Sequence, residues 1–517
     1  MESERIRNSS RNIRWGLINQ ALMILGPFVT RTVILYTLGT AYLGLNSLFT
    51  SILQVLNMAE LGFASAIVYN MYKPIALGNT ELVCALMKLY KKVYRLIGIS
   101  ILIIGAVLIP FLSYLIKGSY PSDINLTYLY LVYLLDVASS YFLFAYQNCL
   151  LVAHQRNDIV SKIAVIMHIV MYAGQCILLI LTKDYMYYAL LMPVYTISNN
   201  IYCAYISRKY YPQYICSGEV GEEIKNDIKK QVSGLLITKI AATTRNSFDS
   251  IIMSAFIGIS IVGVYGNYSL IMSGVISLLI VILRGIQASV GNSVAIESKE
   301  KNYSDFLNLV FIYAWLSGFC TTVMFCLYQP FIKLWAGIDN LLSLDIVILQ
   351  CLYFYFLTAG DVTSVYIDAT GIWSKYKLKA VLESISNLVI NLMLVQKFGI
   401  FGIVFSTVIT RLLFGFFWGE YLMFKSYFGI QFLNKFYYSY TQYFLITIIA
   451  SALSWMCCEY LIFPVFIDFI FRILICCIIF NVLFYTAFNK RKEFYDIKNI
   501  IRYRFFTKNF TSGDDER

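Results

Sequence analysis

Long apolar stretches recur along the whole chain, and this succession constrains the fold more than any other feature of the sequence. Each stretch is close to the roughly 20 residues that a helix needs to cross the hydrocarbon core of a bilayer. They lie at residues 15–38, 43–72, 93–116, 126–152, 163–182, 185–207, 232–257, 261–291, 306–334, 344–368, 378–396, 400–424, 440–462 and 465–488. The sequence therefore predicts an all-α, polytopic membrane protein with about fourteen transmembrane helices.

The composition agrees with a chain whose solvent is mostly lipid. Of its 517 residues, 59% are hydrophobic and 14% are charged, whereas soluble proteins carry about 25% charged residues. Arg5, Arg7, Arg11 and Arg14 precede a first apolar stretch that is too long for a signal-peptide core. We expect this stretch to remain as an uncleaved first helix.

The distribution of Lys and Arg predicts the orientation. With both termini in the cytoplasm, the cytoplasmic segments hold 31 of the 41 basic residues, and the opposite side holds four. Positive charge accumulates on the cytoplasmic side of membrane proteins. The same bias accounts for the net charge of +12, and no basic run interleaved with aromatic residues indicates nucleic-acid binding.

A weak internal repeat predicts the domain organisation. Residues 38–44 (LGTAYLG) align with residues 257–263 (IGISIVG), and each segment joins the first two helices of a six-helix block. Two blocks of this kind are parallel repeats around a central cavity. We expect one six-helix lobe over 1–231, a second over 232–439, two further helices within 440–488 and a basic cytoplasmic tail over 489–517.

Several classes of function lack their sequence signatures. The chain has no phosphate-binding GxxxxGK[ST] loop for ATP hydrolysis. The short external loops argue against a membrane glycosyltransferase or polymerase, and His154 and His168 have no triad partners nearby. The twelve cysteines show no zinc-binding spacing and are interpreted as small apolar residues. We expect no enzyme activity, no cofactor and no metal site.

Arginines within the predicted spans point to a cationic cavity. Arg245, Arg284 and Arg411 lie deep in their apolar stretches, and Arg31 lies beyond the midplane of its stretch, from where its side chain could also reach the outer interface. A charge at the bilayer centre costs about 2.5 to 3.5 kcal/mol unless it faces the protein interior. Arginine binds phosphate oxygens through two parallel hydrogen bonds. These four residues are the predicted substrate-binding residues for a multiply anionic ligand.

Carboxylates in the same spans are candidates for coupling to protons or sodium, or for neutralising the arginines. Asp249 follows Arg245 by one helical turn. Gly26-Pro27 and Pro193 are expected to break their helices and to act as hinges. The candidate carboxylates are Glu60, Asp136, Asp249 and Asp361, with Asp368 and Glu420 as further buried acids.

One segment of the N-terminal half carries a family resemblance. It comprises Arg31-Thr32-Val33, Leu38-Gly39, Tyr42-Leu43-Gly44-Leu45-Asn46-Ser47-Leu48-Phe49, Ala59-Glu60-Leu61-Gly62, Ala66-Ile67-Val68 and Tyr72-Lys73-Pro74. In this segment the chain closely resembles the polysaccharide flippases, the Wzx-type branch of the multidrug, oligosaccharidyl-lipid and polysaccharide exporter superfamily. The resemblance weakens in the second half and is weakest after residue 425.

The resemblance implies a function and a location. It implies a flippase in the bacterial cytoplasmic membrane that turns over undecaprenyl-pyrophosphate-linked oligosaccharides by alternating access, for a surface polysaccharide such as O-antigen. The implied partners are this lipid-linked substrate, membrane lipid, and the polysaccharide polymerase and chain-length proteins. A lipid II type flippase and a cation-coupled multidrug exporter of the same superfamily are the alternatives.

Overall fold

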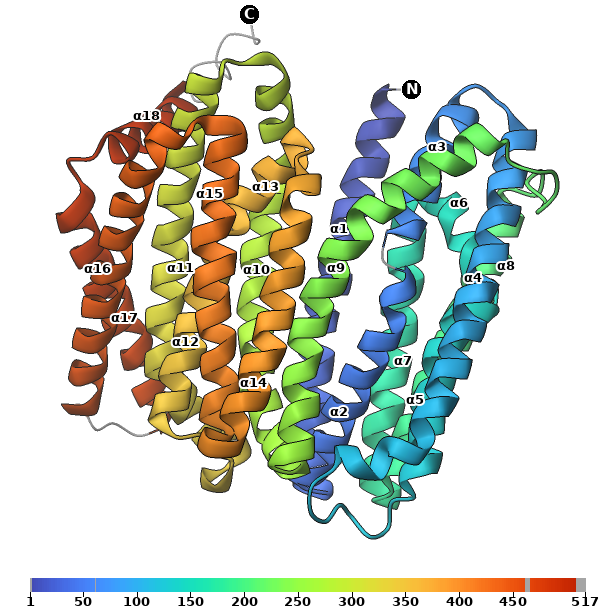
Figure 1. Ribbon diagram of the computed structural model, residues 1–517, viewed down its shortest axis with the longest axis horizontal. Coiled ribbons are helices and arrows are strands. Elements are labelled where there is room, and N and C mark those ends of the chain that lie inside the picture. The colour runs from blue at the N-terminus through green and yellow to red at the C-terminus, as the bar shows by residue number, and fades with distance from the viewer. Residues whose placement is uncertain (1, 61, 461–464, 508–517) are drawn as a thin grey trace, which may run out of the picture. The chain divides into compact units, whose positions relative to one another are not determined.

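The computed structural model describes residues 2–60, 62–460 and 465–507 of the chain, and the described residues contain helices and no strand (Figure 1). The backbone clusters into two compact units, described separately below. Unit 1 comprises residues 1–267 with 388–403, and unit 2 comprises residues 268–387 with 404–517. The predicted lobe boundaries after residues 231 and 439 stay a prediction.

Unit 1 is built from the N-terminal helices. They are α1 (Glu2–Thr37), α2 (Thr40–Leu56), α3 (Phe63–Ala76), α4 (Thr80–Leu108), α5 (Leu126–Phe142), α6 (Asn148–Ala153), α7 (Asn157–Thr182), α8 (Tyr185–Tyr210) and α9 (Glu222–Phe256). Helix α1 packs on α7, α8 packs on both α5 and α7, and α9 packs on α2 and α3. A single apolar core runs through this unit from Ile34 in α1 to Ile259.

Unit 2 contains the remaining helices. Helix α10 (Ile259–Ile296) starts in unit 1 and continues into unit 2. It is followed by α11 (Lys299–Ala336), α12 (Leu344–Ala359), α13 (Asp361–Thr370), α14 (Trp373–Thr410), α15 (Gly419–Met423), α16 (Leu433–Tyr460), α17 (Val465–Phe488) and α18 (Lys492–Thr507). Helix α11 packs against α12, α16, α17 and α18, and Figure 1 shows α16 and α17 beside it.

Most of the described residues in the fourteen predicted stretches lie in helix. Among the described residues, nine helices are long and apolar enough to cross a membrane, or ten if α5 and the bent segment after it form one span. One of the nine, Trp373–Phe428, is 56 residues long and is interrupted at Gly399, where φ is 56° and ψ is −134°. This glycine separates the predicted spans 378–396 and 400–424. The chain is thus an all-α, multi-pass membrane protein.

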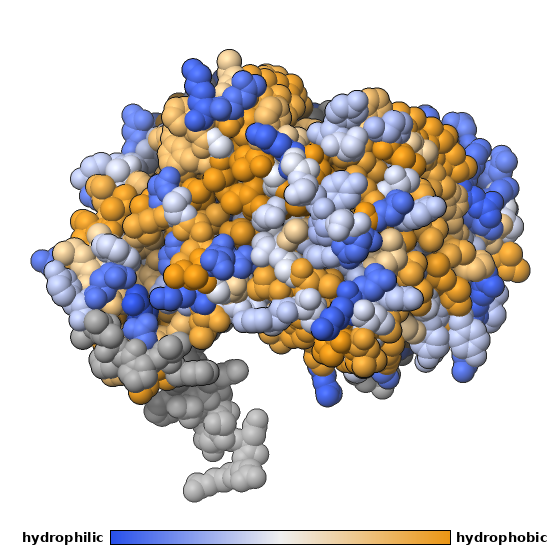
Figure 2. All heavy atoms as spheres, turned by 90° about the horizontal axis from the view of Figure 1, so that it is seen from below, coloured by the Kyte–Doolittle hydropathy of each residue, from blue (hydrophilic) through white to orange (hydrophobic). Residues whose placement is uncertain are grey.

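Apolar side chains cover much of the outside of these helices. Val107, Tyr114, Val170 and Leu181 are each at least 60% exposed, and Figure 2 shows orange, apolar residues reaching the surface over broad areas of one face. Exposed apolar patches of this extent are rare on soluble monomers. They are the surfaces that lipid covers.

The predicted helix breaks at Pro27 and Pro193 were wrong. Helix α1 runs through Pro27, and α8 runs through Pro193. A proline removes one backbone hydrogen bond and crowds one carbonyl, so the turns on either side can stay helical. The interruptions instead follow α2, where Gly62 has a φ of 100°, and α5, where Phe144 has a φ of 60°.

Candidate functional site

Arg31 occupies a buried site in unit 1 that is made of neutral hydrogen-bond acceptors. Its Nε and Nη2 atoms donate to Oδ1 of Asn267 at 3.2 and 2.9 Å, and Nη2 also donates to the Gly263 carbonyl at 3.2 Å. Its Nη1 donates to the hydroxyl of Ser47 at 3.4 Å. The side-chain hydroxyls of Tyr133, Tyr185 and Tyr188 lie near enough to interact with it electrostatically. Amide, carbonyl and hydroxyl groups satisfy the guanidinium but leave its positive charge in place.

Glycines allow the backbones around Arg31 to approach closely. A Cβ at position 266 would lie 2.9 Å from both Arg31 Nη2 and Ser47 Oγ. A Cβ at Gly44 would lie 2.0 Å from the Ile259 carbonyl oxygen, and one at Gly263 would lie 2.4 Å from the Thr40 carbonyl oxygen. Gly44 and Gly263 are the matching glycines of the predicted repeat. The start of α2 therefore lies against the start of α10 at the point where the two repeat motifs meet.

Arg245 and Asp249 are both buried on α9, one helical turn apart. The Asp249 carboxylate accepts a hydrogen bond from the side-chain amide of Asn391 at 2.7 Å. Asn391 belongs to the segment of α14 that packs within unit 1. The predicted ion pair between Arg245 and Asp249 stays a prediction, and the side chain of Glu60 lies outside the described residues.

Arg284 lies on an exposed face of α10 in unit 2. Gln287, Ser289 and Asn292 are exposed on the same stretch, and a Cβ at Gly285 would meet no atom within 4 Å. A helix in a membrane cannot present arginine, amide and hydroxyl groups to lipid without a large cost. The predicted position of Arg284 in a cavity stays a prediction. On the same stretch of α10, the Gln287 amide donates to the Asp368 carboxylate at 3.2 Å.

Arg411 is the first residue of a π-helical segment, Arg411–Trp418, and contacts other residues of unit 2. Its Nε and Nη2 donate to the carbonyls of Phe356 and Leu357 at 3.3 and 2.9 Å. These carbonyls belong to the last turn of α12, where backbone carbonyl groups have no hydrogen-bond donor within the helix itself. Its Nη1 lies 3.7 Å from Oε1 of Glu383, so a carboxylate offsets its charge.

Glu383 is a buried acid that the sequence interpretation missed. Its side chain is 5% exposed and its second oxygen, Oε2, pairs with Nζ of Lys379 at 3.0 Å, one helical turn before it. Both residues lie at the start of the predicted span 378–396. The spacing of four residues between Lys379 and Glu383 on one helix was the available signal.

Two further carboxylates lie close to this pair. The Tyr313 hydroxyl donates to Asp361 at 2.9 Å, and the Thr363 hydroxyl lies 2.8 and 2.9 Å from the two oxygens of Glu420. Both acids interact electrostatically with Arg411. We call Lys379, Glu383, Arg411, Asp361 and Glu420 the unit 2 charge cluster. Three carboxylates facing two cations leave an excess of one negative charge, which a proton or a monovalent cation can balance.

Asp136 stands apart from both of these sites. It lies on α5 in unit 1 and accepts a hydrogen bond from the Thr196 hydroxyl of α8 at 2.5 Å. This bond ties two packed helices together. Within unit 1 the structure thus brings Arg31 together with neutral partners, and within unit 2 it brings Arg411 together with Asp361.

Comparisons with known proteins identify the fold. No family model and no curated protein matches the chain, but solved structures of transporters do. The lipid II flippase MurJ in an inward closed conformation is similar, with a TM-score of 0.65 and 16% identity, over 92% of this chain and 99% of that one. A MATE family multidrug transporter of the MOP superfamily, inward-facing, gives a TM-score of 0.61 and 13% identity over 77% of this chain and 94% of that one.

An outward-facing MATE transporter of the same superfamily also matches, with a TM-score of 0.54, 12% identity and coverage of 80% of this chain and 96% of that chain. At these identities the likeness concerns the fold. The chain therefore has the fold that MurJ shares with the MATE transporters of the MOP superfamily. These neighbours are transporters and a flippase, and none of the three is described as an enzyme.

Proposed function

We propose that the chain is a flippase that moves a lipid-linked oligosaccharide, attached through pyrophosphate, across the bacterial cytoplasmic membrane by alternating access. Both termini lie in the cytoplasm in this proposal, as the distribution of Lys and Arg predicts. The oligosaccharides carried by such lipids are incorporated into a surface polysaccharide such as O-antigen. The proposal rests chiefly on one observation, the buried Arg31 held by neutral acceptors.

The chemistry of Arg31 suits exchange with a pyrophosphate. Arginine and phosphate are both charged and form two parallel hydrogen bonds, so their charges attract each other in a way that a neutral amide or carbonyl acceptor does not supply. A substrate phosphate can therefore displace the Asn267 amide and the Gly263 carbonyl from the guanidinium. An arginine already paired with a carboxylate would gain much less from the same exchange. We assign Arg31 to the pyrophosphate and keep Arg284 as a further candidate for binding the anionic substrate.

Two further observations support a flippase over a drug exporter. The likeness to the lipid II flippase extends over 92% of this chain, against 77% for the inward-facing MATE transporter. Arg31 also lies within the motif that resembles the polysaccharide flippases. A drug exporter for lipophilic cations would require a carboxylate-lined binding site, whereas the described groups that accept hydrogen bonds from Arg31 are neutral.

The decisive experiment follows the lipid-linked oligosaccharide after deletion of the gene. We expect the oligosaccharide to accumulate in the cytoplasmic leaflet, as shown by its protection from a glycosidase added outside. Wild type and Arg95→Ala, a control at an exposed arginine, should restore transfer. Arg31→Ala should lower transfer at least tenfold, or about 1.4 kcal/mol, and Arg31→Lys should fall between them.

The other outcomes separate the alternatives. Accumulation of lipid II in place of the oligosaccharide would favour a lipid II flippase. A change in drug susceptibility with no accumulated lipid-linked sugar would favour the exporter. Full rescue by Arg31→Ala, with the variant present in the membrane at the wild-type level, would show that Arg31 does not bind the substrate.

A further inference from the structure

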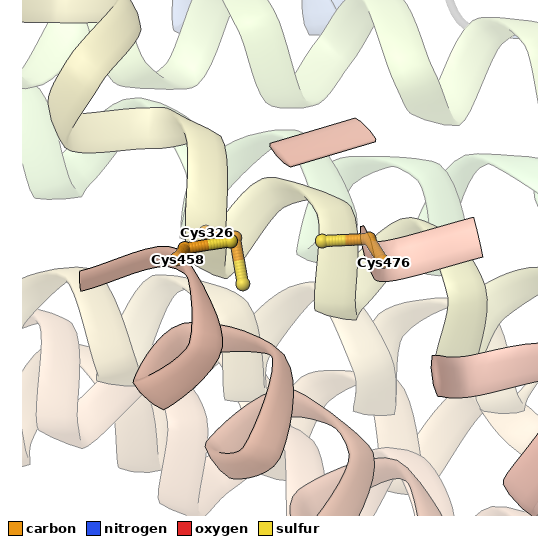
Figure 3. Close-up of side chains that lie close together, drawn as sticks. All are labelled: Cys326, Cys458 and Cys476. Carbon is orange, nitrogen blue, oxygen red and sulfur yellow. The ribbon is translucent and has the colours of Figure 1, made fainter. Parts of the chain in front are cut away.

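Three cysteines from three different helices of unit 2 come together inside the protein. Cys326 lies in α11, Cys458 in α16 and Cys476 in α17, and their sulfur atoms all lie within 4.8 Å of one another. Figure 3 shows the side chains of Cys326 and Cys458 next to each other, with the Cys476 sulfur pointing toward them. No spacing in the sequence predicts this cluster, because 132 residues separate Cys326 from Cys458.

The cluster is dry and apolar. The three cysteines are at most 1% exposed, and partly buried Val323, Phe325, Trp455 and Ile475 pack around them. The adjacent Cys457 and Cys477 do not belong to the cluster, and Cys457 is exposed. The cluster is therefore set by the packing of three helices and not by a local richness in cysteine.

We propose that Cys326, Cys458 and Cys476 form a three-coordinate site for a soft, thiophilic metal ion, monovalent copper. Sulfur ligands select soft ions such as Cu(I), and carboxylate or water ligands select harder ones. For an equilateral triangle with sides of 4.8 Å, the centre lies about 2.8 Å from each corner, since 4.8 divided by √3 is 2.8. Small side-chain rotations shorten this to the roughly 2.3 Å of a metal–thiolate bond.

The number of ligands distinguishes copper from zinc. Structural zinc sites are almost always tetrahedral and use four protein ligands. In the described part of the chain the cluster offers three sulfurs and no fourth histidine, cysteine or carboxylate. Three soft ligands without a fourth donor suit a trigonal Cu(I) ion better than a four-coordinate Zn(II) ion.

Bound copper would connect the C-terminal helix pair to the rest of unit 2. Helices α16 and α17 contact α11 through side-chain packing, and a shared ion adds one coordinate bond from each helix. This role is independent of the proposed flippase function.

The test uses full-length protein in lipid nanodiscs, kept reduced and free of oxygen, and titrated with Cu(I) against a chromophoric Cu(I) chelator. We expect one Cu(I) per chain, three sulfur neighbours in X-ray absorption and a higher unfolding temperature. Cys326→Ser and Cys458→Ala should each weaken binding at least tenfold. Cys457→Ser and Cys477→Ser are matched controls one residue away from the cluster and should bind as wild type does.

Several results would overturn the proposal. One is an absence of Cu(I) binding by the wild type, which would leave the cysteines as small packing residues. A second is equal loss of binding in the two control variants. A third is tighter binding of Zn(II) than of Cu(I), and a fourth is a disulfide between two of the three cysteines in the reduced preparation.

Discussion

Arg31 and Arg411 are two arginines within predicted membrane spans that the protein accommodates in different ways. In unit 1, Arg31 donates to an amide, a carbonyl and a hydroxyl, so its charge persists. In unit 2, Arg411 donates to two carbonyls and lies beside Glu383, so its charge is offset. The same residue type therefore has a charge available for an anionic ligand in one unit and is part of an ion pair in the other.

This difference suggests a division of labour. In the proposed function, the Arg31 site binds the anionic substrate. The unit 2 charge cluster carries an excess of carboxylate and suits a proton or a monovalent cation. Substrate binding and energy coupling would then belong to different units of one chain.

The largest expected effect comes from removing the carboxylate that holds the unit 2 charge cluster together. Glu383→Gln removes the carboxylate that pairs directly with both Lys379 and Arg411, and breaking a buried ion pair typically costs about 3 to 5 kcal/mol of folding stability. The measurement is the unfolding temperature in detergent. Asp305→Asn is the matched control, because Asp305 also pairs with a lysine four residues away, Lys301, but at the surface, where such pairs contribute about 0 to 1 kcal/mol.

A second substitution identifies the cause. Adding Lys379→Met to Glu383→Gln also removes one of the two cations that pair with Glu383 and should recover part of the lost stability. Equal destabilisation by Glu383→Gln and Asp305→Asn would show that Arg411 and Lys379 do not depend on Glu383.

Periodicity and apolarity were sufficient to predict the helices, because lipid requires every span to be helical and apolar. They were also sufficient to select Arg31, Arg245 and Asp249, which are all buried. A charge in the middle of an apolar stretch is visible in the sequence without any knowledge of its neighbours.

The partners of those charges could not be predicted, because they come from distant parts of the chain. Asn267 reaches Arg31 across 236 residues, and Asn391 reaches Asp249 across 142. Glu383 lies inside the predicted span 378–396, but nothing in the sequence shows that Arg411 lies beside it. The cysteine cluster was missed for the same reason as the partners: only the packing of three helices brings it together.

The next effect concerns coupling and tests the role assigned to unit 2. Asp361→Asn retains the side-chain size and the possibility of a bond with Tyr313, but removes one negative charge from the cluster. We expect transport driven by a proton or sodium gradient to fall about tenfold, which is about 1.4 kcal/mol, while substrate affinity changes little. The measurement is uptake of lipid-linked oligosaccharide into proteoliposomes with imposed gradients.

Asp368→Asn is the control for this experiment, because Asp368 is an exposed acid of the same helix. An equal loss in both variants would mean that the overall charge of α13 matters and that Asp361 has no special role. A loss of substrate affinity in Asp361→Asn alone would place substrate binding in unit 2 and would reverse the proposed division.

The smallest effect tests the packing around Arg31 and uses two glycines of the same helix, α10. Replacing glycine by alanine inside a helix stabilises it by roughly 0.5 to 1 kcal/mol when nothing is in the way. Gly285→Ala points into open space and should show this gain in an unfolding measurement. Gly266→Ala places its methyl group 2.9 Å from the Arg31 guanidinium and from the Ser47 hydroxyl, so part or all of the gain should be lost as these groups shift.

Because the shift also moves Arg31, Gly266→Ala should lower oligosaccharide transfer and Gly285→Ala should not. Equal stability and equal transfer in the two variants would mean that Arg31 moves away from Gly266 without cost, and the neutral acceptors would then not hold it.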